Sequence, residues 1–203
     1  MKKVLNLLAI CLCAAAVVWC CGVISDRIML NEGLIRLHVV ANSDSEADQA
    51  LKLRVRDAVV ESLQDAMTDI ADAEKAKAYL MENLQEIEAV ANQTLAEAGC
   101  EDTAVAALSE EVFDTRYYDT FTLPAGVYQA LRITIGEGEG KNWWCVVFPA
   151  LCLPATSEGF DDVAAGAGFP DALTAALEGE DGYELRFWLL DALGRMENMF
   201  FKG

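Results

Sequence analysis

The stretch from Leu34 to Leu63 restricts the fold of this chain most, because it encodes a strand, a polar corner and a helix with no break between them. From Leu34 to Val40 the side chains alternate between two faces, and a two-residue period is typical of a β-strand. One face carries Ile35, Leu37 and Val39, and the other carries Arg36, His38 and Val40. We therefore expect a strand of a sheet here.

The corner and the helix come directly after this strand. Asn42-Ser43-Asp44-Ser45 ends the alternation with residues that favour turns and helix starts. Ser45 and Asp48 resemble a capping box, with Asp where Glu or Gln is commoner. Behind them an apolar residue recurs at every fourth position: Leu51, Val55, Val59 and Leu63. This spacing predicts an amphipathic helix that packs on a sheet.

The middle of the chain predicts a second helix and three further strands. Residues 73–98 have helical periodicity and end before Gly99, a favoured residue just after a helix. Residues 104–112 alternate weakly, residues 127–135 alternate clearly, and residues 142–148 are apolar on both faces, as in a covered central strand. The glycine-rich link 136–141 lacks the spacing of a phosphate-binding loop, so we expect a hairpin between the last two strands.

The C-terminal quarter has a different composition. Residues 155–182 are mostly small, glycine or acidic, which predicts a mobile surface insertion with a short helix near 171–177. Tyr183–Leu190 alternates enough to predict a last strand. We expect a single α+β domain over residues 25–203, with a mixed sheet of about five strands and two consecutive helices packed on it.

The N-terminus carries an export signal. Lys2 and Lys3 precede an apolar run from Val4 to Ile24. A positive start followed by an apolar segment predicts export of the remainder, and 21 residues are also long enough to cross a bilayer as a helix. Residues 1–24 are therefore either a signal peptide or a membrane anchor, and the sequence leaves both open.

The charge balance restricts the partners. The chain has 33 acidic and 15 basic residues, for a formal charge of −18. Such a surface repels the phosphates of nucleic acids. We therefore expect no nucleic-acid partner.

The polar residues do not form a recognisable catalytic pattern. His38 is the one histidine, and no spacing pairs it with a nucleophile or metal ligands, so we expect a structural role, no metal and no cofactor. A calcium loop starting at Asn42 would need glycine at Ala47 and an acid at Leu53. A non-enzymatic module is favoured, with an exported hydrolase using carboxylates as the alternative.

Two cysteines of the exported part have a spacing that permits a disulfide. Cys145 and Cys152 approach bonding distance if the chain folds back at Pro149. The oxidising surroundings of an exported domain allow such a bond, and two buried thiols are the alternative.

Two long segments resemble a known family. The run IRLHVVANSDSEADQALKLRVRDAVVESL and the segment Pro124–Cys152, PAGVYQALRITIGEGEGKNWWCVVFPALC, are similar to the characteristic blocks of stage II sporulation protein R of endospore-forming bacteria. This resemblance implies a protein secreted from the forespore into the space between the two membranes. It also implies a partner, a membrane-embedded aspartic protease that processes the mother-cell pro-sigma-E factor.

The polar corner is the candidate docking surface for such a partner. It comprises Asn42, Ser43, Asp44 and Ser45 with Asp48, and Trp144 is a further candidate. The same corner residues also have a structural explanation, as turn and helix cap. A cap requires Ser45 but not Asp44, so the sequence alone predicts that Asp44→Ala leaves the fold almost unchanged.

Overall fold

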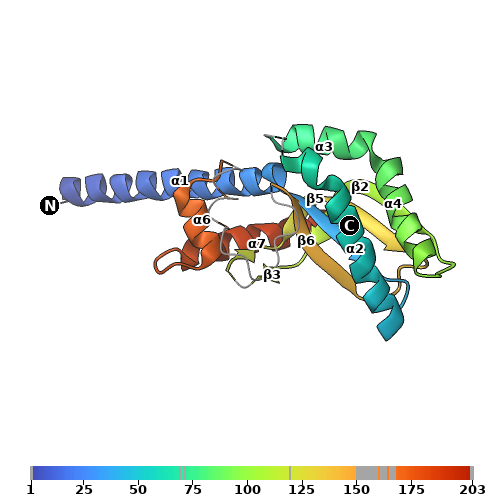
Figure 1. The fold of residues 1–203 in the computed structure, drawn as a ribbon. Helices are drawn as coiled ribbons and strands as arrows, with labels where there is room; N and C mark the ends of the chain where they lie inside the picture. The colour runs from blue at the N-terminus through green and yellow to red at the C-terminus, as the bar shows by residue number, and fades with distance from the viewer. Residues whose placement is uncertain are drawn as a thin grey trace.

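The strand β1 (Ile35–Val40) lies inside a four-stranded mixed sheet (Figure 1). The strand order is β2 (Ala104–Phe113), β5 (Gly126–Ile135), β1 and β6 (Asn142–Phe148). β1 is parallel to β5, whereas β2 and β6 are antiparallel to their neighbours. The α+β class and the mixed sheet predicted from the sequence are therefore confirmed.

The structure is a computed structural model, and part of the chain is not described in it. The described residues are 2–68, 70, 72–118, 120–149, 160, 164 and 168–201.

Three helices cover one face of the sheet. They are α2 (Glu46–Thr68), α3 (Ala73–Glu82) and α4 (Leu84–Glu97). The predicted helix 73–98 is interrupted at Asn83, whose side-chain amide donates to the carbonyl of Tyr79 at 2.8 Å. The main core lies between these helices and the sheet, and includes Leu37, Val39, Val55, Val59, Leu63, Leu80, Leu95, Leu131 and Ile133.

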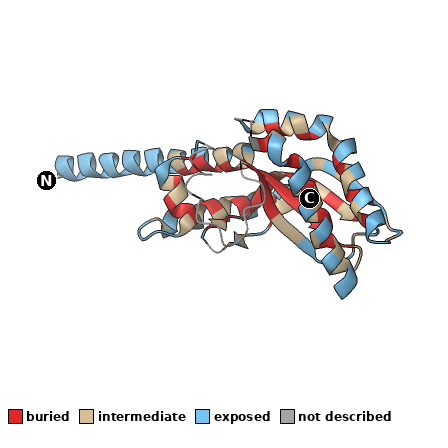
Figure 2. Cartoon of the chain, viewed as in Figure 1, coloured by how far each residue is buried: buried red, intermediate tan, exposed pale blue. Residues whose placement is uncertain are grey.

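The opposite face of the sheet is covered as well (Figure 2). The end of α1 (Lys2–Gly33), α6 (Asp171–Glu178) and α7 (Glu184–Phe201) form a second core with it. A two-stranded sheet of β3 (Arg116–Tyr117) and β4 (Thr122–Leu123) lies at the side. Because both faces are covered, all six residues of β1 are buried.

The predicted hairpin of residues 127–135 and 142–148 is wrong. Both segments are strands, but β1 lies between them, so β5 and β6 are not paired. The six-residue link 136–141 crosses the end of β1. Two strand spacings amount to only about 10 Å, which six residues cover easily, so loop length did not distinguish a hairpin from this crossing.

The predicted last strand, Tyr183–Leu190, is also wrong, because the helix α7 begins at Glu184 and includes the rest of this segment. The alternation of apolar residues holds only over this short window. The buried residues of the whole element are Leu190, Gly194 and Asn198, which recur at every fourth position. That spacing is helical, and it places one face of α7 against β5. The main sheet therefore has four strands.

The predicted insertion 155–182 lies partly outside the described residues. Its described part contains α6, close to the short helix expected near 171–177, and this helix buries Leu173 and Leu177 in the second core. Phe160 and Phe169 are buried there too. The few large apolar residues of this part face the second core, so this part contributes to packing. A surface insertion would not do so.

The apolar N-terminal helix is confirmed. α1 is continuous over 32 residues, is exposed along most of its length, and is long and apolar enough to cross a membrane. Its last turns belong to the domain, where Val23, Asp26, Arg27 and Leu30 are buried. The expected boundary near residue 24 therefore falls inside one helix.

The close approach of α7 to the turn before β5 generates a prediction. A methyl group at Gly194 would lie 1.6 Å from the carbonyl oxygen of Ala125, so Gly194→Ala must push the helix off the sheet. We expect it to lower the free energy of unfolding by about 2 kcal/mol, measured by urea denaturation of the full chain in detergent. Gly22→Ala is the control, because its methyl group has only an ordinary contact, 3.9 Å from Arg186. Equal stability of the two variants would contradict the docking of α7.

Candidate functional site

The polar corner caps α2, as predicted. The backbone N–H of Asp48 donates to Oγ of Ser45 at 3.1 Å. The reciprocal bond of a capping box is replaced by a relay through Ser43. Its hydroxyl donates to Asp48 Oδ2 at 2.5 Å and accepts from the backbone N–H of Ser45 at 3.1 Å. The short polar side chains therefore satisfy backbone donors that the first helical turn leaves open.

The corner also holds the glycine-rich link, which the sequence did not reveal. Asn42 Oδ1 accepts from the backbone N–H of Glu137 at 2.9 Å, and Asp44 Oδ1 accepts from that of Lys141 at 2.7 Å. Gly140 approaches so closely that a methyl group there would lie 2.3 Å from the carbonyl oxygen of Ser43. Only glycine fits such an approach, so link and corner form one unit.

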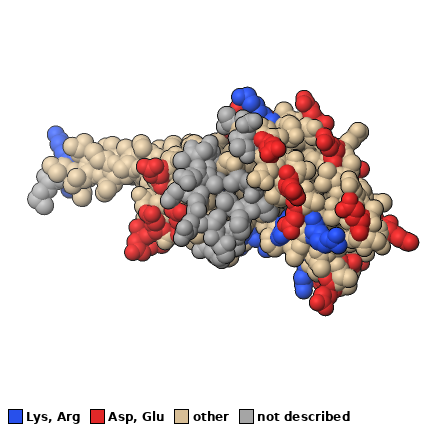
Figure 3. All heavy atoms as spheres, viewed as in Figure 1, with Lys and Arg blue, Asp and Glu red and all other residues tan. Residues whose placement is uncertain are grey.

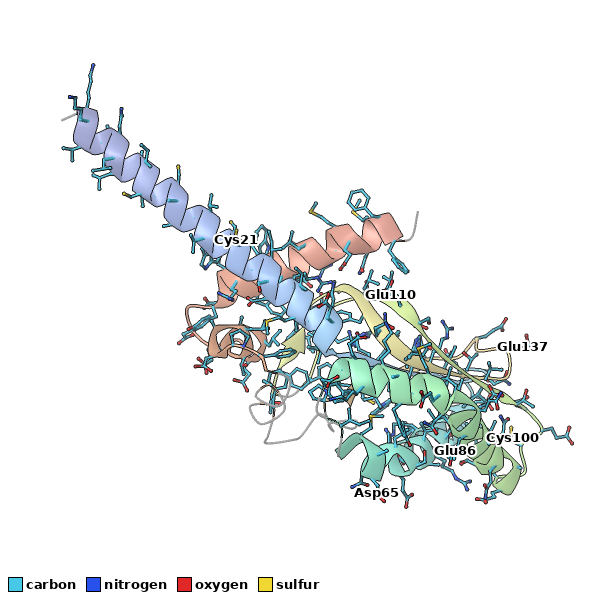
Figure 4. The ribbon with its side chains drawn as sticks, turned by 90° about the horizontal axis from the view of Figure 1, so that it is seen from above. Cys21, Asp65, Glu86, Cys100, Glu110 and Glu137 are labelled. Carbon is cyan, nitrogen blue, oxygen red and sulfur yellow. The ribbon has the colours of Figure 1, made fainter. Side chains whose placement is uncertain are left out.

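These bonds correct the expectation for Asp44. Its side chain is 57% exposed but it fixes the link through the Lys141 N–H, with the Lys141 ammonium 4.0 Å away. Loss of this acceptor therefore affects the fold as well as any contact. The unit lies at the end of β1 that is farther from α1, and Figure 4 shows Glu137 of the link at the end of the domain opposite the start of α1.

Trp144 lies apart from the corner. It packs on the second core, where its ring stacks on His38 with the ring centroids 3.9 Å apart. The guanidinium of Arg116 covers it at 4.6 Å. The register pairs Trp144 with His38 and Asn142 with Val40, so two strand positions separate Trp144 from the end of β1. The structure therefore does not bring Trp144 and the corner into one patch.

His38 has the structural surroundings that we expected for it, with one exception. Its Nδ1 lies 2.7 Å from Oε2 of Glu111, and the residue, stacked against Trp144, is 4% exposed. Its Nε2 finds no hydrogen-bond partner among the described residues. Burial alone would raise the pKa of Glu111, but His38 and Arg132 outweigh it and hold that pKa below its ordinary value. A ring so enclosed suits a role in packing better than proton transfer to a substrate.

Arg36 is the most unusual buried residue, and sequence reasoning did not single it out. It is 0% exposed, its guanidinium lies 3.9 Å above the ring of Phe113, and Nη2 donates to the hydroxyl of Tyr118 at 3.1 Å. Nε and Nη1 have no partner within the described part of the chain. Burial lowers the pKa of this guanidinium. The aromatic faces compensate part of the desolvation, as cation–π contacts do. The available signal was an arginine within a short run of otherwise apolar residues.

A pocket of about 650 Å³ is lined by residues of α1, α3, β2, β5 and α7. Its lining carries four carboxylates, those of Glu32, Glu74, Glu110 and Glu197. Glu197 accepts from Asn31 at 3.1 Å and pairs with Arg27 at 2.5 Å. This carboxylate therefore joins α1 to α7, and the pocket gives no particular support to the hydrolase alternative. Within the described residues, no group of three or more His, Cys, Asp or Glu side chains is placed to hold a metal.

Of the two cysteines predicted to pair, Cys145 alone is among the described residues. Cys145 is buried in the main core and is disulfide-bonded. Cys152 lies outside the described residues, so its pairing with Cys145 stays a prediction.

The chain is similar to known proteins over the part that contains β1, α2, β5 and β6. The family described as stage II sporulation protein R matches residues 31–158. A curated relative, stage II sporulation protein R of Bacillus subtilis (strain 168), is 38% identical over 135 residues, which are 66% of this chain and 60% of that protein. The chain is therefore aligned with less than two thirds of the relative's length. No solved structure matches the chain.

The carboxylate of Glu111, which contacts His38 and Arg132, predicts a specific pH dependence. Because the folded pKa of Glu111 lies below its ordinary 4.5, its stabilising effect is complete above that pH and is lost as the pH falls through the folded value. The free energy of unfolding should therefore fall more steeply between about pH 5 and pH 3 in the wild type than in Glu111→Gln. Urea denaturation of both proteins across this range measures the difference. Parallel curves would show that Glu111 does not stabilise the fold as an anion.

Proposed function

The chain belongs to the stage II sporulation protein R family, and from this membership we propose that it is an extracytoplasmic signal that activates a membrane-embedded aspartic protease. That protease would process the mother-cell pro-sigma-E factor. The proposal rests above all on the match over residues 31–158, which supports a role in sporulation. In this proposal the chain acts by binding, without a catalytic site of its own.

The N-terminal helix supports the extracytoplasmic location. Lys2 and Lys3 precede a long apolar helix, and that order favours export of the domain on its C-terminal side. A domain released or held on the far side of the forespore membrane would face the space between the two membranes. Asp26 and Arg27 of the same helix are ion-paired with Arg186 and Glu197 of α7, so the last turns of α1 belong to the domain that we propose is exported.

The corner remains the proposed contact surface, with Asn42, Ser43, Asp44, Ser45 and Asp48 as its members. Asp44 and Ser45 are exposed, and the link beneath them holds the corner in one shape. A fixed and exposed tip loses little conformational entropy when it binds. Trp144 is the second candidate, because its ring is only partly buried at the side of the sheet.

Export generates a first functional prediction. The assay is co-expression of the chain, the protease and pro-sigma-E in a non-sporulating host, with processing followed by immunoblot. Deletion of residues 4–24 should abolish processing, because the domain then stays in the cytoplasm. An unrelated signal peptide in place of residues 4–24 is the control, and it should restore processing if secretion is sufficient. Full processing by the deleted form would refute the extracytoplasmic location.

The corner generates a second functional prediction. Asp44→Asn keeps the oxygen that accepts from Lys141 but removes the charge, whereas Asp44→Ala removes both. We expect Asp44→Ala to lower the free energy of unfolding by about 1 kcal/mol and Asp44→Asn to change it little. If the corner binds the protease through this charge, Asp44→Asn lowers processing nonetheless. Asp65→Asn, an exposed acid at the other end of α2, is the matched control. Normal processing by Asp44→Asn would remove Asp44 from the contact.

A further inference from the structure

The outer face of α7 is apolar. Leu185, Trp188, Met196, Met199 and Phe200 are exposed, and steps of three, eight, three and one residues place them on one side of the helix. Trp188 is 62% exposed, Met199 76% and Phe200 81%. A surface helix normally turns such a stripe toward the core. An exposed apolar face of this kind marks a site of interaction with a protein or a membrane.

The charged residues of α7 point mostly the other way. Arg186 and Glu197 pair with Asp26 and Arg27 of α1, and Asp191 accepts from the backbone N–H of Ala125 at 2.9 Å. These ionic contacts fix the helix to the domain. The outward side of α7 is thus mostly apolar, although the chain has 33 acidic residues. The exposed charged residues of α7 are Glu184 and Arg195.

The same contacts show that α7 crosses α1. Arg186 Nε donates to Asp26 Oδ2 at 2.7 Å, and Glu197 binds Arg27 and Asn31. The step from Arg186 to Glu197 is about 16 Å along α7, whereas their partners Asp26 and Asn31 are only about 8 Å apart along α1, so the two helices are inclined to each other. Figures 1 and 4 show α7 beside the second half of α1, and in Figure 4 the two helices cross just beyond Cys21. The outer face of α7 is turned away from the sheet, because the opposite face, with Leu190, Gly194 and Asn198, packs on β5.

The surface of α1 indicates where a bilayer would end. Within this fully described stretch, no charged side chain is exposed between Lys3 and Glu32, since Asp26 and Arg27 are buried. Figure 3 shows the free part of α1 without charge beyond its first residues. These roughly 28 residues extend about 42 Å, more than the roughly 30 Å of a hydrocarbon core. Ile24 and Ile28 are exposed, so the apolar surface reaches the level at which α7 crosses.

We propose that α7 lies on the surface of the bilayer that α1 crosses, with Trp188, Met196 and Met199 at the boundary between head groups and acyl chains. Exposed aromatic and apolar residues on a helix in the membrane plane bind by burying apolar area, and tryptophan favours this depth. The chain is acidic, so attraction to anionic lipids has no part in the binding. The proposal rests on α1 staying in the bilayer as an anchor, which is one of the two fates of α1 that the proposed function allows. It concerns a helix beyond residues 31–158 that match the family.

Quenching of tryptophan by brominated lipid tests this proposal. The full chain is reconstituted in phosphatidylcholine vesicles with or without bromine on the acyl chains near the head groups. Trp19→Phe leaves Trp188 as the reporter of α7, and Trp188→Phe leaves Trp19 as the reporter of α1. The double variant gives the background from Trp143 and Trp144. In the Trp19→Phe protein we expect bromine to remove up to about a third of the emission, since one of three tryptophans contacts lipid.

The outcomes distinguish membrane contact of α7 from membrane insertion of α1. Quenching of Trp19→Phe beyond the double variant supports the membrane contact of α7. If Trp188→Phe is quenched but Trp19→Phe matches the double variant, α1 is inserted and the proposal for α7 is overturned; its face then binds protein, such as a second copy. If neither variant is quenched beyond the background, membrane insertion of α1 is refuted and the inference falls with it.

Discussion

The rest of the structure depends on the burial of β1 between β5 and β6, with helices on both faces of the sheet. This placement puts Arg36 inside the second core, where aromatic rings and the Tyr118 hydroxyl replace the carboxylate that a buried guanidinium usually has. It also explains why two distant segments carry the family resemblance. The first supplies β1 and α2 and the second supplies β5 and β6, and in space they form one three-stranded unit.

The same strand separates the two ends of the domain. α1 ends just before the start of β1, and the corner follows the end of β1. The two ends of this strand are about 20 Å apart. If α1 crosses the bilayer and α7 lies on its surface, the corner faces away from that membrane. A signal held in this way would present its tip across the gap to a protein in the opposite membrane. Membrane attachment and partner recognition would then use separate surfaces.

Sequence reasoning succeeded where one local pattern determined the element. The cap at Ser45, the seam of α2 and the apolar strand β6 result from neighbouring residues alone. It failed where tertiary contacts decided. Six residues after Ile135 fit a hairpin as well as a crossing over β1, and only the pairing partners distinguish the two. Tyr183–Leu190 alternates like a strand, but the helix is set by Leu190, Gly194 and Asn198 against β5. The role of Asp44 depends on Lys141, almost a hundred residues later, so no local pattern contained it.

The central claim is that the membrane-distal corner binds the protease. Site-specific photocrosslinking in the co-expression host tests it most directly. A photoreactive amino acid is placed at Glu46, which is exposed beside the corner, or at Asp65, which is exposed at the other end of α2. We predict a crosslink to the protease from position 46 and none from position 65. A crosslink from position 65 with none from position 46 would contradict the claim.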